Sequence, residues 1–557
     1  MLQRFRHVLV IVLVVLGSAL VVAACGSGDD GGSGAGAAGT EGKAAEAIPA
    51  DSLFFTSVNI DADSDAWKQL TEVGSRFPGW AQVVQEFNTS LNETSEDGTS
   101  WSADIQPWLG GEAGIAVTEL DVTQPSSPEP VVVGYVESKD DAKAAAVITK
   151  TEGVKPLADY KGYKRWGMDD DGFAAIGKNA VLIGTSEAVL QEAIDTREGG
   201  GSSLADAQAF KDTLKELPED NLGVIYVDGP KLAQLVALAA QSAPQLPTTD
   251  EDGSGGAQAQ QQQIAQALDQ LRVLKSIGMS FGADDGGFRF RTATIMDEER
   301  AKTLGIATED FEPSLTGRVP ATTLAYFGFQ NLGPMLKTTL DGLTGQSPQV
   351  AQAIAAIEAM TGAKFDSEVV PLLSGEHALY VAPGNPGPIP AVGLLLKPTD
   401  ATQGAATIRK LTDALVRELS ASGSEPGINV EDIPNGQRFS GEALSGLSVV
   451  WRQSGDVIAV SNDATAGDEP GESLADSDKW KSLKESAGVG DDVSALAYVD
   501  IPGILDAVRA AGAGAEIDSD PNVAANIKPL GGLAMWGDSK DGGITTADVY
   551  LEVRAAG

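Results

Sequence analysis

Apolar and polar residues alternate along several stretches of the chain, and this alternation predicts β-strands. In Phe-Arg-Phe-Arg at residues 288–291, and again over residues 548–554, apolar positions recur at every second residue. A period of two residues is that of a strand with one face in water and the other in a core. The pattern therefore predicts sheets that cover a core on one side.

A helical pattern follows some of the predicted strands directly. The apolar run at residues 180–186 predicts a strand, and residues 187–195 predict a helix that Thr185 or Ser186 caps. Other predicted strands follow one another across turns instead of alternating with helices. This order favours an α+β fold in which each half has a largely antiparallel sheet with helices on one face.

The chain matches itself in two halves, because six blocks of the first half recur in the same order in the second. The matched blocks are 48–60 with 319–332, 105–117 with 369–381, 130–136 with 390–396, 203–214 with 473–484, 222–236 with 495–508, and 284–295 with 540–553. Such a series indicates two tandem repeats from an old duplication, each of roughly 250 residues, which is a normal domain size.

The repeat divides the chain into five parts. These are a signal peptide over residues 1–24, a flexible tether over 25–47, a first α+β repeat over 48–302, a linker over 303–317 and a second α+β repeat over 318–557. Residues 241–263 of the first repeat are rich in Gln, Ser, Pro and acidic residues, and their counterpart in the second repeat is shorter. They are expected to be a disordered insertion.

The N-terminus has the three-part layout of an export signal. Arg4 and Arg6 precede an apolar run over residues 8–22, which is short for a stable membrane span. Residues 22–25, Val-Ala-Ala-Cys, resemble the lipobox of bacterial lipoproteins, in which the cysteine sulfur carries a diacylglyceryl group and the signal is cut before it. The resemblance implies that Cys25 is lipidated and holds the protein on the extracytoplasmic face of the cell membrane. An ordinary signal peptide or a membrane span is the alternative.

Charge and cysteine content narrow the classes of partner. The chain has 79 acidic and 39 basic residues, a formal net charge of −40. This balance argues against nucleic acid and against direct adhesion to anionic lipid, because both require basic patches. Cys25 is the only cysteine, so the mature chain has no disulfide and its stability depends on the burial of a core.

The two halves open alike, with Ile-Pro-Ala-Asp-Ser-Leu-Phe-Phe from residue 48 and Val-Pro-Ala-Thr-Thr-Leu-Ala-Tyr from residue 319. Gly-Gly-Glu and Ser-Gly-Glu turns follow at residues 110–112 and 374–376. This arrangement resembles an uncharacterised family of exported bacterial proteins of unknown function, found in actinobacteria and cyanobacteria. The resemblance covers both halves and implies their shared architecture. It implies no activity and no catalytic residues.

Residues 61–72 have the acid spacing of a calcium-binding loop, with acids at loop positions one, three, five and twelve. Position six of such a loop needs glycine for its sharp turn, and here it is Ala66. The matching segment after Gln330 carries no acids in Asn-Leu-Gly-Pro-Met-Leu. The acids therefore fit the start of a helix better than a metal site.

Residues 278–282, Gly-Met-Ser-Phe-Gly, fit the G-x-S-x-G pattern of a nucleophilic serine. The base would be His377, the only histidine after the predicted signal peptide. The pattern requires a helix after the serine, but a strand is predicted there. In the aligned halves, Met535 takes the place of Ser280, and Ala113 takes the place of His377. A serine inside a strand is therefore the preferred interpretation.

Glu112 and Glu376 occupy the same position in the two halves, each between a Gly-containing turn and an apolar strand. A structural role at the turn is the commoner explanation for such a residue, and carboxylate chemistry is the alternative. One histidine and no free thiol in the mature chain argue against the usual zinc, copper and haem sites. No cofactor and no metal ion is predicted.

Three functions fit these observations. The leading hypothesis is a non-enzymatic, lipid-anchored envelope protein that acts as a binding or scaffold module for an unknown envelope protein, glycan or lipid. The main alternative is a carrier of lipid or another apolar ligand, with a sheet curved around an apolar cavity. A serine hydrolase that uses Ser280 and His377 is the third hypothesis.

Overall fold

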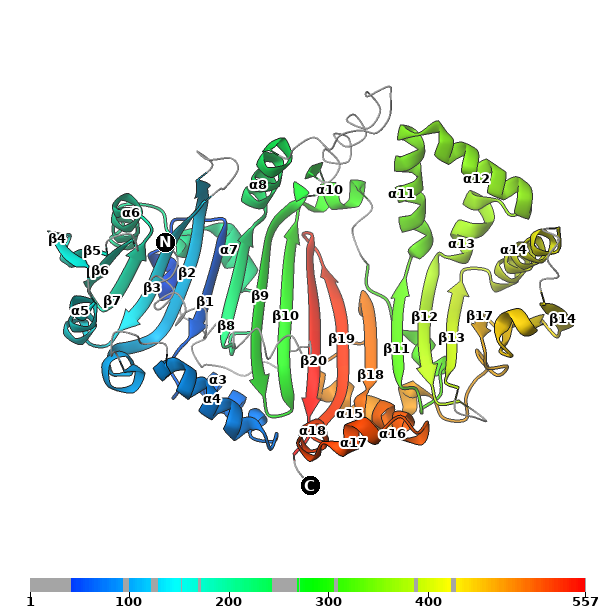
Figure 1. The fold of residues 1–557 in the computed structure, drawn as a ribbon. Coiled ribbons are helices and arrows are strands. Elements are labelled where there is room, and N and C mark those ends of the chain that lie inside the picture. Colours follow the sequence, from blue (N-terminus) through cyan, green and yellow to red (C-terminus); the bar gives the residue numbers. More distant parts are fainter. Residues whose placement is uncertain are drawn as a thin grey trace. The chain divides into compact units, whose positions relative to one another are not determined.

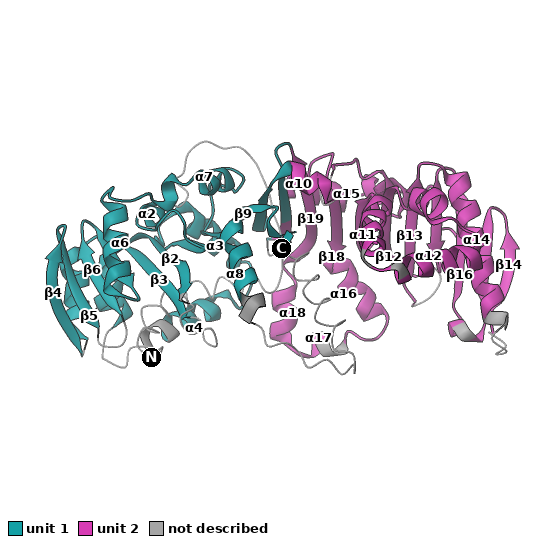
Figure 2. Cartoon of the chain, turned by 90° about the horizontal axis from the view of Figure 1, so that it is seen from above, with its two compact units in different colours: residues 1–298, 541–548, 555–557 teal, residues 299–540, 549–554 magenta. Residues whose placement is uncertain are grey.

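The computed structural model describes residues 42–93, 100–121, 129–151, 153–168, 172–242, 268–269, 271–304, 309–384, 389–421 and 427–555. These residues belong to two compact units, which Figure 2 colours separately. Unit 1 comprises Met1–Glu298, Asp541–Asp548 and Ala555–Gly557, and unit 2 comprises Glu299–Lys540 and Val549–Arg554. The last strand of the chain therefore contributes residues to both units.

Unit 1 is built on a sheet in which neighbouring strands are antiparallel. The strands follow one another in the order β10, β9, β8, β1, β2, β3, β7, β6, β5, β4 (Figure 1). Their bounds are β1 Phe54–Asn59, β2 Leu109–Asp121, β3 Glu129–Ser138, β4 Val154–Tyr160, β5 Tyr163–Met168, β6 Phe173–Gly177, β7 Ala180–Gly184, β8 Gly223–Asp228, β9 Leu274–Asp284 and β10 Gly287–Met296. The antiparallel sheet that the alternation predicts is present in this unit.

The helices of unit 1 lie between these strands in the chain. They are α2 Lys43–Glu46, α3 Asp65–Gly74, α4 Trp80–Glu93, η1 Trp101–Ile105, η2 Gln106–Trp108, α5 Asp141–Lys150, α6 Glu187–Arg197, η3 Leu204–Asp206, α7 Gln208–Leu214 and α8 Gly229–Ser242, with α10 Glu298–Thr303 at the boundary. Helix α6 starts as the sequence predicts, because Ser186 Oγ accepts a hydrogen bond from Val189 N at 3.2 Å.

Helices pack against both faces of the unit 1 sheet, so the expectation of helices on one face is wrong. Tyr135 of β3 lies in a core with Leu190 of α6, whereas its neighbour Val136 lies in a second core with Ala144 of α5. Successive side chains of a strand point to opposite faces, so the two cores lie on opposite sides. The all-apolar strand β7, buried at every position, shows the same double cover.

Unit 2 repeats this strand order with its own elements. Its strands follow in the order β20, β19, β18, β11, β12, β13, β17, β16, β15, β14, and the pairs from β19 to β14 are antiparallel. Their bounds are β11 Ala325–Gln330, β12 Gly375–Ala382, β13 Ala391–Pro398, β14 Asn429–Ile433, β15 Gly436–Ser440, β16 Ser448–Ser454, β17 Val457–Ser461, β18 Ala495–Asp500, β19 Leu530–Lys540 and β20 Ile544–Val553.

The helices of unit 2 include two that join at Ser347 and one of 21 residues. They are η4 Ser314–Arg318, α11 Leu332–Gln346, α12 Pro348–Thr361, η5 Phe365–Val369, α13 Val370–Leu372, α14 Ala401–Ala421, η6 Glu442–Leu444, η7 Leu474–Asp476, α15 Asp478–Ala487, α16 Ile501–Ala510, α17 Ala515–Ser519 and α18 Pro521–Ile527.

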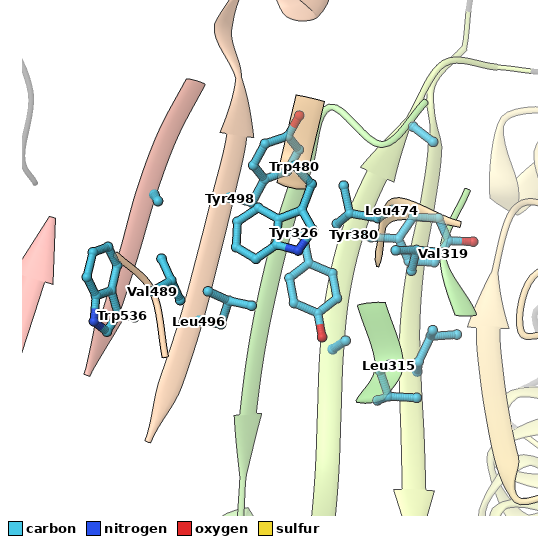
Figure 3. Packing of buried hydrophobic residues seen from close by; sticks show 14 of the residues in the cluster. Leu315, Val319, Tyr326, Tyr380, Leu474, Trp480, Val489, Leu496, Tyr498 and Trp536 are labelled. Atoms are coloured by element: carbon cyan, nitrogen blue, oxygen red, sulfur yellow. The ribbon is translucent and has the colours of Figure 1, made fainter. Parts of the chain in front are cut away.

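Several large aromatic side chains lie in the larger core of unit 2. Figure 3 shows Tyr326, Tyr380, Trp480, Tyr498 and Trp536 packed together with aliphatic residues. The rings of Trp480 and Tyr498 meet edge to face, with centroids 5.5 Å apart. A second core on the other face contains Leu396, Trp451 and Ile458. This second core covers the sheet only over β13, β16 and β17, where α13 and α14 pack.

The structure corrects the ends of the predicted tether and linker. Residues 43–47 were expected in the tether, but Lys43–Glu46 form α2, and Ala44, Ala45 and Ala47 are fully buried in the core of unit 1. Leu315 was expected in the linker, but it lies in η4 and is fully buried in unit 2. Both segments are short helices whose burial depends on strands that lie far away in the sequence.

Candidate functional site

The predicted lipidation site, Cys25, lies outside the described residues, as do the rest of the predicted signal peptide and the start of the tether. The predicted insertion is described only at Gln241 and Ser242, which end α8. In the part of the chain that the structure describes, no helix is long and apolar enough to cross a membrane.

Ser280 and His377 belong to different units, and both are buried. Ser280 lies within β9 and is 3% exposed. The His377 ring is fully buried, its Nε2 lies 2.9 Å from the Leu373 carbonyl oxygen, and burial lowers its pKa below the usual value. A nucleophilic serine must be reachable by a substrate and by its base. The structure therefore brings no such pair together within either unit.

Strand register corrects one match between the two halves. Ser280 lies opposite Val224, and Trp536 lies opposite Leu496, the residue that the block alignment pairs with Val224. Ser280 therefore corresponds to Trp536 and not to Met535. Both side chains point into the core of their own unit, where Trp536 is 3% exposed.

The acidic stretch at residues 61–72 forms the start of a helix. Helix α3 begins at Asp65, and Ser64 Oγ accepts a hydrogen bond from Trp67 N at 3.4 Å. Asp65 pairs with Lys68 at 2.8 Å. Among the described residues, no group of three His, Cys, Asp or Glu side chains is placed to hold a metal ion. The helix interpretation of this stretch is confirmed.

Glu112 and Glu376 each bind the short helix that precedes the first strand of their unit. The backbone N–H of Ala44 in α2 donates to Glu112 Oε2 at 3.1 Å. The backbone N–H of Leu315 in η4 donates to Glu376 Oε1 at 2.7 Å, and the Ser314 hydroxyl donates to the other oxygen. The two glutamates therefore act on a helix, a different structural role from the predicted turn.

Burial changes the acidity of both carboxyl groups. It raises the pKa of Glu112 to about 7, and the hydrogen bond from Ala44 only partly opposes this. Glu112 Oε1 is buried and accepts no hydrogen bond from the described residues. Burial also raises the pKa of Glu376, but the bonds from Ser314 and Leu315 and the charge of Lys397 oppose it.

The cation beside each glutamate comes from a different element in the two units. In unit 1, Lys43 Nζ of α2 donates to Glu137 Oε1 of β3 at 3.1 Å. In unit 2, Lys397 Nζ of β13 donates to Ser314 Oγ of η4 at 2.8 Å. Both contacts hold a helix on a strand. Glu112 and Glu376 are themselves buried, with 3% and 8% exposure, and their contacts favour a structural role.

A hollow of about 610 Å³ on unit 1 has mainly polar and small walls. It is lined by Pro49, Ala50, Asp51, Ala188, Gln191, Glu192, Asp195, Thr196, Gly200, Gly201 and Ser202. Lys231 binds Asp51 at 3.0 Å, and Lys161 binds Asp195 at 2.7 Å, so two of its acids are already paired. The hollow does not provide the apolar lining that a lipid or another apolar ligand requires.

One face of the unit 2 sheet carries exposed apolar side chains. Phe327 lies directly opposite Leu379 on the next strand and opposite Ala497 on the other side, and Ala497 lies opposite Met535. Residues that face one another in an antiparallel pair point to the same side of the sheet. Phe327 is 45% exposed and Leu379 is 46% exposed.

These residues and their neighbours form a surface that we call the apolar face. It consists of Phe327, Leu379, Val392 and Met535, which are exposed, and of the half-buried Val381, Leu394, Val499 and Leu533. The register places all eight on one side of the sheet. Figure 1 shows α11, α12 and α13 at one end of strands β11 to β13. A continuous patch of this kind marks an interaction surface more often than isolated exposed residues do.

The matching positions of unit 1 are covered. Thr56, at the place of Phe327, is 4% exposed, and Ile115, at the place of Leu379, is half-buried. Helix α3 follows β1 and packs against β9, whereas α11, which follows β11, packs against α12 and α13. Other elements also cover this face of unit 1, because Ile115 packs against a core that contains Ile105 of η1, Trp108 of η2 and Ala144 of α5.

The family described as protein of unknown function DUF3352 matches residues 8–553, almost the whole chain. The chain belongs to the DUF3352 family. This agrees with the expected resemblance to a family of unknown function. No curated protein matches the chain.

Crystal structures of TP0453 are similar to part of this DUF3352 protein. Crystal form III of TP0453 has a TM-score of 0.24 and 7% sequence identity, over 48% of this chain and 88% of the other. Crystal form IV has a TM-score of 0.24 and 6% identity, over 47% and 84%. At such low scores the likeness indicates nothing about function.

Sequence reasoning missed the apolar face of this DUF3352 protein. Phe327 and Leu379 stand in strands with regular apolar positions, which predict burial and not exposure. One signal was present in the aligned halves, because the position of polar Thr56 in the first half is taken by Phe327 in the second. A large apolar residue in one half, where the other half has threonine, indicates that different elements cover the two positions.

Proposed function

We propose that the protein is a lipid-anchored, non-enzymatic binding module on the extracytoplasmic face of the cell membrane, and that the apolar face of unit 2 receives an apolar partner. The exposed apolar face carries this proposal, since the matching positions of unit 1, Thr56 and Ile115, are covered. The buried state of Ser280 and His377 gives no support to a hydrolase.

The anchor rests on the residues around Cys25. Val-Ala-Ala-Cys stands at the end of the apolar run, and a stretch rich in Gly and Ser follows at once. Two or three acyl chains hold a protein firmly on a membrane, because each buried methylene contributes about 0.8 kcal/mol. Such an anchor keeps the apolar face near membrane-associated partners.

We also propose that the two units are tandem repeats of one ancestral domain. The same order of strands in both units supports a duplication, as do the helix-binding glutamates Glu112 and Glu376. Asp228 and Asp500 support it further, because each accepts a hydrogen bond from the backbone N–H three residues later and so caps the helix that follows its strand. After a duplication, the same sheet face could remain covered by other elements in one unit and become exposed in the other.

Replacing Cys25 with serine should release the protein from the membrane. The substitution removes the only sulfur that can take a diacylglyceryl group and leaves the charged and apolar parts of the export signal intact. We expect the variant in the soluble extracytoplasmic fraction, whereas the control Ser27→Ala stays with the membrane. Fractionation must be combined with mass spectrometry, because a stalled cleavage would leave residues 8–24 as a weak anchor. Wild-type protein from membranes with an unmodified Cys25 would contradict the proposal.

A charge on the apolar face should weaken apolar binding. We expect Leu379→Lys to lower the fluorescence of the neutral apolar dye N-phenylnaphthylamine several-fold, because lysine disrupts the centre of the face. Val430→Lys is the matched control, since Val430 is an exposed apolar residue on β14 of the same unit. Equal dye binding by both variants would exclude the face as the binding site.

A carrier of lipid or another apolar ligand is the alternative form of this function. Its apolar ligand would lie on the same face. Native mass spectrometry of the purified mature protein distinguishes the two, because a carrier retains a co-purifying lipid and a protein-binding module does not. Pull-down from detergent-solubilised envelopes, with Leu379→Lys as the comparison, then identifies a protein or glycan partner.

A further inference from the structure

Helix α12 exposes large apolar side chains to water, and its one charged residue is half-buried and paired. Ile357 and Met360 are 55% and 51% exposed. The only charged residue of the helix, Glu358, accepts hydrogen bonds from Lys364 Nζ and from the backbone N–H of Phe365, both at 2.8 Å, and its side chain is 23% exposed. A helix on the surface of a water-soluble domain normally has the opposite arrangement.

The neighbouring helix α11 also exposes large apolar side chains. Helix α12 packs against α11 and α14. We call the exposed large apolar residues of α11 and α12 the hairpin surface: Met335 and Leu343 of α11, and Ile357 and Met360 of α12. Alanines 351, 353, 355, 356 and 359 of α12 are also exposed. Helix α12 therefore exposes apolar side chains over several turns.

The chemistry of the hairpin surface favours lipid over a protein partner. Residues 332–361 contain no aromatic residue and no arginine, the types that anchor most protein interfaces. Their charges, together with Lys364, are two lysines and two acids, so this stretch is neutral in a chain of net charge −40. Lys337 is paired with Asp341 and with Asp366. A neutral apolar surface loses little hydration when it enters the boundary of a bilayer.

We propose that the hairpin surface lies in the outer boundary of a lipid bilayer and forms a second membrane contact. The helices cannot span the bilayer, because 15 residues of α11 at a rise of 1.5 Å reach about 22 Å, less than the hydrocarbon thickness of about 30 Å. They can lie in the interface with Ile357 and Met360 among the acyl chains. This inference rests on the proposed function, since the Cys25 anchor brings unit 2 to the membrane.

The single cysteine allows a direct test with the acylated protein. Once Cys25 carries lipid, an Ile357→Cys substitution gives the chain one free thiol, which can be labelled with the environment-sensitive dye NBD. The labelled protein is reconstituted into phosphatidylcholine vesicles. We expect a several-fold rise in NBD emission, a shift to shorter wavelength and quenching by spin-labelled lipid. Val83→Cys is the matched control, because Val83 of α4 is 51% exposed, and it should show none of these changes.

A second substitution separates lipid contact from other causes. Met360→Glu in the labelled chain should abolish the change at residue 357, whereas Val84→Glu should leave it intact. An unchanged emission on vesicles would overturn the proposal. Emission that rises with protein concentration but is not quenched by spin-labelled lipid would indicate a second copy of the chain and would also overturn it. Labelling of Cys25 itself, seen by mass spectrometry, would instead show that the anchor proposal has failed.

Discussion

Glu112→Gln is expected to make unit 1 more stable than the wild-type unit at pH 8, with a smaller difference at pH 5. Burial raises the pKa of Glu112 to about 7 from an ordinary value of 4.5, so the folded protein favours the protonated form. The stability that this preference contributes is complete below pH 4.5 and is lost as the pH rises through 7. Between pH 5 and 8 the loss is about 2–3 kcal/mol. Glutamine keeps an oxygen that can accept the hydrogen bond from Ala44 and never ionises.

Hydrogen exchange in peptides that cover residues 43–50 measures this effect, because α2 is the element that Glu112 binds. Glu376→Gln is the matched control in unit 2. Its carboxylate already accepts hydrogen bonds from Ser314 and Leu315 near Lys397, so a smaller pH-dependent gain is expected there. If the wild type and Glu112→Gln lose protection in parallel from pH 5 to pH 8, Glu112 does not titrate in this range.

Much of the strand structure could be predicted from the chain, because the alternation of apolar and polar residues follows the geometry of a strand. The alignment of the halves paired Glu112 with Glu376, and both accept a hydrogen bond from a preceding helix. Local pattern fixes where a strand lies and which of its residues share a face. It does not fix what packs on that face.

The burial of α2 shows why local pattern was insufficient. Residues 43–47 are mainly alanine, and such a composition also occurs in a flexible tether. The helix is buried because Gly114 lets it approach β2: a Cβ on Gly114 would lie 2.7 Å from the Cβ of Ala44. This contact joins residues that are 70 positions apart in the sequence, so no local window contains both.

Local pattern was also insufficient to predict which helices pack on each face of the sheets. The two faces of β3 carry separate cores in unit 1, although the sequence pattern predicts helices on one face only. The buried run Ala180–Gly184 was the available signal, because a strand that is apolar at each position has both faces covered. For the apolar face the signal was Phe327 at the place of Thr56, and for α12 it was the lack of charge in residues 348–357.

Trp480→Ala is expected to destabilise unit 2, with a loss of about 3–5 kcal/mol in the free energy of unfolding. Trp480 is 5% exposed and packs in the main core of the unit, where its ring meets Tyr498 edge to face. Truncation removes this aromatic contact, which contributes about 1 kcal/mol. It also leaves a cavity in the core.

Trp480→Phe should cost less than half as much, because unit 1 has a phenylalanine at this place. Phe210 meets Tyr226 edge to face with centroids 5.1 Å apart, in the same arrangement as Trp480 and Tyr498. Urea-dependent hydrogen exchange should be followed separately in peptides of α15 and of α7, since a chain of two units need not unfold in one step. We expect Trp480→Ala to lower protection in α15 and to leave α7 unchanged. An equal loss from alanine and phenylalanine would mean that the indole makes a contact which no other ring can replace, and that the two cores are less alike than their rings suggest.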